Sequence, residues 1–137
     1  MRLFVQKFIE LMLLAAAADG QISAAERDTI LEVVGRNRKM PALTVEQLGH
    51  VQNLLLEKYK SGATAEAIVE AAALAFTSEV KLVAYALCVG VVLADTRLLP
   101  NEAEFLKLLR AAFQLPKGKV DSIHLSAQLR LGIDNLS

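Results

Sequence analysis

Apolar positions recur along most of the chain at intervals of three or four residues, the spacing that places side chains on one face of an α-helix. Short polar stretches containing serine, threonine, glycine or proline separate these segments. The pattern predicts helices at about residues 2–18, 24–35, 45–60, 65–75, 78–94, 100–113 and 119–131. No stretch alternates apolar and polar residues for long enough to predict a strand. The sequence therefore predicts an all-α fold, a compact single-domain bundle of about seven helices spanning residues 1–137.

Short polar side chains mark where several of these helices begin. Ser23 with Glu26, and Thr44 with Gln47, have the spacing of a capping box, in which each side chain bonds to the backbone N–H of the other residue. Ser78 is the predicted cap of the fifth helix. These positions define the helix starts more sharply than the apolar pattern alone.

One eight-residue module occurs twice, each time behind an apolar, alanine-containing segment. It reads DGQISAAE in the first copy and DTRLLPNE in the second. Aligning Asp19 with Asp95 also aligns Glu26 with Glu102 and superposes the helices on either side. We therefore expect two helix-loop-helix halves packed about a pseudo-twofold axis. The halves span about residues 2–35 and 78–113.

Composition narrows the class of protein. The chain is 54% hydrophobic and 5% aromatic, with no tryptophan, so its core must be mostly aliphatic and alanine. Lys+Arg and Asp+Glu are both 15, so no overall field attracts nucleic acid, and few aromatic rings are present to stack on bases. We expect no nucleic-acid partner. The basic group beginning at Arg36 is interpreted as a solvated helix end.

The apolar segments do not predict a membrane anchor. The first twenty residues have the outline of a signal peptide, but Glu10 interrupts the apolar run, which leads directly into the repeated module, so a mature helix is favoured. Residues 82–94 are too few to span a bilayer. We expect a cytoplasmic protein with peripheral membrane contact at most.

No arrangement of residues predicts catalysis. Cys88 lies in an apolar run and is expected to be a small buried residue rather than a nucleophile. His50 and His124 have no cysteine or carboxylate at ligand spacing and are expected at the surface. The serines lack a nucleophile motif. The sequence predicts a protein that is not an enzyme.

The repeated module resembles a known family. ADGQISAAE, which ends at Glu26, and more weakly ADTRLLPNE, which ends at Glu102, look like the tellurite-resistance TerB-like domain. A similar domain begins some membrane-anchored DnaJ-like co-chaperones. The resemblance implies an all-helical domain with two such modules, associated with resistance to tellurite and other stresses, and with no established enzymatic activity.

The resemblance also implies a divalent-cation site, because acidic residues clustered in the family are proposed to bind metal ions. Ca²⁺ and Mg²⁺ prefer oxygen ligands such as carboxylates. In the second module Arg97 places a positive charge beside the acidic residue, and Leu99 stands where Ser23 does, so that capping box is lost. The implied metal ligands are Asp19, Glu26, Asp95 and Glu102.

Two functional hypotheses follow. The chain is either a TerB-like module that binds a divalent cation or a protein partner in a stress response, or a helical interaction or oligomerisation domain whose acidic residues only cap loops and helices. The first helix is apolar on more than one face, as Phe4, Phe8 and Leu11 indicate. We expect it to be buried on several sides, with a homodimer as the alternative.

Overall fold

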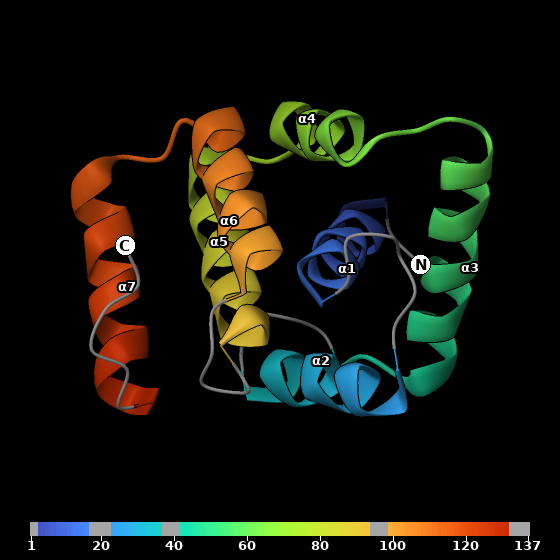
Figure 1. Cartoon of the computed structure of the whole chain (residues 1–137), viewed down its shortest axis with the longest axis horizontal. Coiled ribbons are helices and arrows are strands. Elements are labelled where there is room, and N and C mark those ends of the chain that lie inside the picture. The colour runs from blue at the N-terminus through green and yellow to red at the C-terminus, as the bar shows by residue number, and fades with distance from the viewer. Residues whose placement is uncertain (1–2, 17–22, 37–41, 94–98, 132–137) are drawn as a thin grey trace.

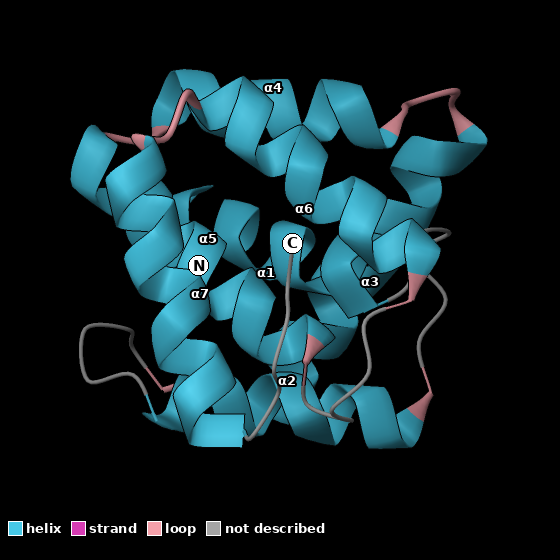
Figure 2. Ribbon diagram, turned by 60° about the vertical axis from the view of Figure 1, so that its left-hand side comes forward, coloured by secondary structure: helices cyan, strands magenta, loops and turns pink. Residues whose placement is uncertain are grey.

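The computed structural model describes residues 3–16, 23–36, 42–93 and 99–131. Within these ranges the chain forms helices joined by turns and short connections, with no strand. The helices are α1 (Leu3–Ala16), α2 (Ala24–Arg36), α3 (Val45–Lys60), α4 (Ala65–Ala75), α5 (Ser78–Val92), α6 (Pro100–Phe113) and α7 (Lys117–Leu131). The all-α prediction is confirmed, as Figures 1 and 2 show.

Helix α1 lies at the centre of the bundle. Residues 8–15 are all buried, and α1 packs against α2, α3, α4, α5 and α6. In Figure 1, α4 lies above it, α2 below it, and α3 and the α5–α6 pair on either side. Because every face of α1 is covered, apolar residues are needed all round it. Burial on several sides, expected from the sequence, is confirmed.

Helix α5 is the second helix with many buried residues. It packs against α1 over the most extensive helix contact of the bundle, and also against α2, α6 and α7. Helices α1 and α5 are the first helices of the two predicted halves. A contact between these equivalent helices is compatible with a twofold relation between the halves, and the repeat itself stays a prediction.

The predicted helix caps are mostly confirmed. The Ser23 N–H donates to Glu26 Oε1 at 2.8 Å, and the Glu26 N–H donates to Ser23 Oγ at 3.1 Å. Thr44 and Gln47 form the same reciprocal pair at 3.0 and 3.1 Å. Each pair satisfies backbone donors that have no partner within the helix.

One predicted helix cap was wrong by one residue, and one predicted helix start was wrong by two. Thr77, not Ser78, caps α5, because the Thr77 hydroxyl accepts from the Val80 N–H at 3.3 Å and Ser78 is already helical. Helix α7 begins at Lys117 rather than near residue 119. The Pro116 carbonyl accepts the N–H of Lys119, so the helix starts two residues earlier than its apolar pattern suggests.

None of the described helices has the length and apolar character needed to cross a membrane.

Among the described residues, one charged side chain lies inside the core. Glu10 of α1 is buried, and Lys58 of α3 donates from Nζ to Glu10 Oε2. The Glu10 side chain is 3% exposed, whereas that of Lys58 is 42% exposed. A buried carboxylate is costly unless it is paired, so this ion pair fixes how α3 docks on α1.

Removing the lysine tests that role. Lys58→Ala should lower the free energy of unfolding by about 2–3 kcal/mol, because it leaves a buried carboxylate without its ion-pair partner. Lys60→Ala, two residues away and exposed, should change it by less than about 0.5 kcal/mol. Urea unfolding measures both. Equal losses in the two variants would contradict the assignment.

Candidate functional site

Two of the four predicted metal ligands, Asp19 and Asp95, lie outside the described residues. Glu26 and Glu102 are described, and each lies in the first turn of a helix. Glu26 Oε1 accepts the Ser23 N–H, and Glu102 Oε1 accepts the Leu99 N–H at 2.8 Å. Both glutamates therefore use one carboxylate oxygen to close a helix start.

The prediction that the second capping box is lost was only half right. Leucine has no side-chain acceptor, so Leu99 cannot receive the N–H of Glu102. The other half of the box needs only a backbone donor at residue 99, and the structure retains it. Pro100 occupies the first turn of α6, where its missing N–H costs nothing.

The described residues do not by themselves form a metal centre. Among residues 3–16, 23–36, 42–93 and 99–131, no three His, Cys, Asp or Glu side chains lie close enough together to hold an ion. Carboxylate chemistry suits Ca²⁺ or Mg²⁺. The two described glutamates are accounted for by capping, so the four-carboxylate site stays a prediction.

Cys88 is completely buried in α5, as expected from its apolar neighbours. Burial raises the pKa of its thiol, because the thiolate would lose its hydration. Burial therefore disfavours the thiolate and shields the sulfur from solvent. The prediction of a structural cysteine is confirmed.

The two histidines differ. His50 is exposed, as predicted. His124 is instead half-buried, and its Nε2 lies 2.6 Å from the hydroxyl oxygen of Tyr85, so the prediction of a surface residue was wrong. Arg110 donates from Nη1 to the same hydroxyl oxygen at 2.8 Å. These three residues join α5, α6 and α7 and form what we call the Tyr85 clamp.

The proton positions in the Tyr85 clamp follow from its donors. Because Arg110 can only donate, the Tyr85 oxygen accepts from it. When His124 is neutral with its proton on Nδ1, the Tyr85 hydroxyl donates to His124 Nε2. That geometry requires neutral His124. Burial lowers the pKa of His124, and the Arg110 charge lowers it further, against a smaller opposite effect of Asp121. Burial raises the pKa of Tyr85, with the Arg110 hydrogen bond acting in the opposite direction.

The lowered pKa of His124 predicts a loss of stability in acid. Above the unfolded pKa of about 6.5 both states are neutral and the clamp is intact. As the pH falls from there towards the folded pKa, the unfolded chain binds a proton first, so the free energy of unfolding falls. Urea unfolding between pH 7.5 and 5.5 should show this fall in the native chain and in His50→Gln. His124→Gln should remove part of it, and parallel profiles would exclude the effect.

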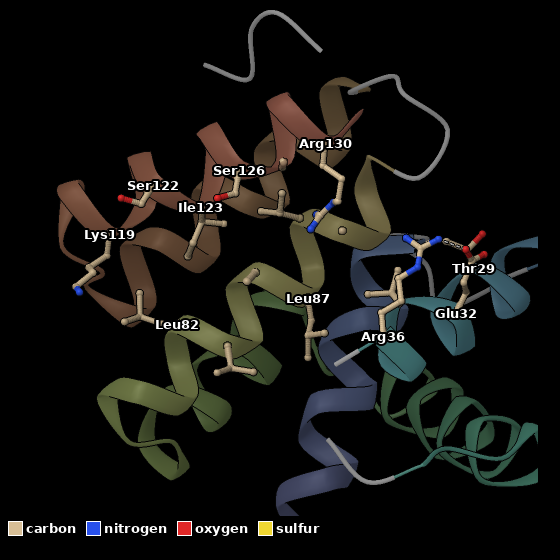
Figure 3. Close-up of a pocket in the computed structure, with 16 residues that line it drawn as sticks. Thr29, Glu32, Arg36, Leu82, Leu87, Lys119, Ser122, Ile123, Ser126 and Arg130 are labelled. Carbon is tan, nitrogen blue, oxygen red and sulfur yellow. Dashed lines mark hydrogen bonds and ion pairs between the residues drawn. The ribbon is translucent and has the colours of Figure 1, made fainter. Parts of the chain in front are cut away.

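A groove with a volume of about 870 Å³ runs between α2, α5 and α7. Helix α5 forms its floor, and α2 and α7 form its walls, as the close-up in Figure 3 shows. The floor is apolar. Its residues are Leu82, Val83, Ala86, Leu87, Val89 and Gly90.

Gly90 explains how closely one wall approaches the floor. A Cβ atom at this position would lie 3.3 Å from Val33 Cγ1 of α2, which is tighter than ordinary contact. The missing side chain therefore lets α2 pack directly onto α5 at the base of the groove.

The rim of the groove carries an excess of positive charge. Among the described residues that line the groove, Arg36, Lys119 and Arg130 are basic and Glu32 alone is acidic. Arg36 is paired with Glu32 on the same helix face. Lys119 and Arg130 form no ion pair within the described part of the chain. Three cations against one anion leave a local charge of +2 on a chain whose formal net charge is +0.

The geometry thus defines a small all-helical domain with an open, apolar-floored and cationic-rimmed groove. Residues 6–125 match the family described as tellurite resistance protein TerB, from within α1 to within α7. The chain belongs to this family, as the repeated module suggested. Comparisons with curated proteins and with solved structures found no match.

Proposed function

We propose that this chain is a non-enzymatic module of the tellurite-resistance type that acts by binding a partner in the groove between α2, α5 and α7. The observation that carries the proposal is the combination of an apolar floor with a cationic rim. A volume of about 870 Å³ lies within the range of ligand sites, roughly 300–1,000 Å³. Apolar floors supply binding energy, and a few charged groups supply orientation.

The reactive side chains support a non-catalytic role. Cys88 is buried, which raises the pKa of its thiol, and Tyr85 and His124 bond to each other. Among the described residues of the groove the one acidic group, Glu32, is paired with Arg36. A general acid or base needs a titratable group free to reach a substrate, and none of these groups is placed for that.

Filling the groove should impair resistance. Ser126 is exposed on α7 and lines the groove, so Ser126→Trp would occupy part of it without disturbing the core. We expect cells that lack the gene and carry this variant to lose tellurite tolerance that the native gene restores. Growth on graded tellurite measures the effect.

Leu129→Trp is the matched control, because Leu129 lies on the same helix, is 76% exposed and does not line the groove. It should keep the native tolerance. Both variants should unfold within about 0.5 kcal/mol of the native protein, as exposed substitutions usually do. Native tolerance in Ser126→Trp would refute the groove as the working surface.

Cation binding at Asp19, Glu26, Asp95 and Glu102 is the alternative that the family suggests. Capping accounts for both described glutamates, so we expect Ca²⁺ or Mg²⁺ to leave the thermal midpoint of metal-free protein unchanged. Ser23→Ala should cost about 1 kcal/mol with or without the ion, because it removes only a cap. An ion at a hundred times its dissociation constant would instead stabilise by about 2.7 kcal/mol. A saturable rise in the midpoint that Asp19→Asn abolishes would establish the ion site.

A further inference from the structure

The groove lies where one further helix could pack between α2 and α7. Helices α2 and α7 both pack against α5, and between them no other described helix covers one face of α5. Four residues on that face are only half-buried, although most of α5 from residue 84 onwards lies in the core. They are Leu82, Val83, Ala86 and Gly90, spaced so that they follow one helical stripe. An apolar helical stripe between two helical walls can accept a further helix packed along it.

The cations are placed at both ends of this groove. Lys119 lies at one end, and Arg130 and Arg36 lie at the other, as Figure 3 shows. Lys119 and Arg130 are eleven residues apart on α7, which at 1.5 Å per residue corresponds to about 16 Å, or three helical turns.

The distance between the cations at the two ends indicates which kind of ligand the groove can bind. A fatty acid or another ligand with a single anionic head can meet the positive charge at only one end. A helix meets both if it has acidic residues eleven positions apart, because three turns return side chains to nearly the same face. We infer that the groove binds an acidic amphipathic helix from a partner protein, about three turns long, with a carboxylate at each end of its buried face. The inference rests on the proposed function, since both use the same groove.

The partner's sequence pattern follows from the geometry. Carboxylates at positions i and i+11 would face Lys119 and the Arg36–Arg130 end, in either direction. Aliphatic residues at i+4 and i+7 fall on the same face and would lie over Ala86 and its neighbours on the floor. The other positions of the partner helix would face solvent, so the groove does not restrict which residues occupy them.

A labelled peptide tests the inference directly. The probe is an alanine-based helix of about eighteen residues with glutamate at i and i+11 and leucine at i+4 and i+7. Fluorescence anisotropy with the full chain should show saturable binding that weakens as salt rises. The same peptide with lysine at the two end positions should bind at least tenfold more weakly. Equal binding of the two peptides would overturn the charge argument.

Variants of the chain locate the binding. Ser126→Trp should abolish it, and Leu129→Trp should not. Neutralising the groove cations in Lys119→Gln/Arg130→Gln should weaken binding roughly 2- to 25-fold, because each exposed ion pair is worth a factor of about 1.4 to 5. Lys60→Gln/Lys107→Gln removes the same charge from exposed positions outside the groove and should have no effect. Equal losses in the two double variants would also overturn the inference.

The outcomes separate this inference from the proposed function. If the glutamate peptide does not bind but Ser126→Trp still abolishes tellurite tolerance, the groove works with another ligand and only the helix inference fails. Co-sedimentation with phosphatidylglycerol vesicles, lost in Ser126→Trp, would identify an anionic lipid as that ligand. Dimerisation of the chain, lost in the same variant, would identify a second copy. If neither binding nor tolerance depends on the groove, both proposals fail.

Discussion

The burial of α1 on every side is the constraint on which the rest of the structure depends. Each fully buried aliphatic or aromatic side chain in residues 8–15 contributes about 1.5–3 kcal/mol, but only if other helices exclude water from it. Five helices are required to cover it. Since α1 also carries the buried carboxylate of Glu10, the covering helices must include one that brings a cation, and Lys58 of α3 does so. The central helix thus specifies both how many neighbours surround it and where one of them docks.

Helix α7 stands outside that arrangement, at the far side of α5 from α1 in Figure 1. Its apolar attachment is modest, with Val120 and Ala127 buried while Leu125 and Leu129 are exposed. The Tyr85 clamp adds a polar attachment through His124. A helix held in this way can stand apart from α2, and the groove between them results. Elements of lower local stability are commonly those that form binding surfaces. Helix α7, which contributes few buried side chains to the core, forms one wall of the groove.

Much of the fold could be predicted because it depends on local sequence. Helical periodicity and the Ser23–Glu26 and Thr44–Gln47 pairs act over three or four residues, and the structure confirms them. What could not be predicted depends on residues distant in the chain. Glu10 finds its partner 48 residues away, and His124 contacts a tyrosine 39 residues away. The groove floor could not be predicted from the sequence for a further reason. Helix α5 is apolar on nearly every face, so its sequence does not indicate which face lines a groove.

The charged residues of the repeated module and those of the groove have different tasks. Glu26 and Glu102 act at helix starts, where their effect extends over a single turn. The groove cations act on whatever enters from solvent. With a net charge of +0 the chain has no long-range field, and at physiological salt a charge is screened beyond about 8 Å. The cations at the two ends are about twice that distance apart, so each must be met by its own anionic group. Recognition at this groove therefore depends on where the ligand carries its charges rather than on how many it carries.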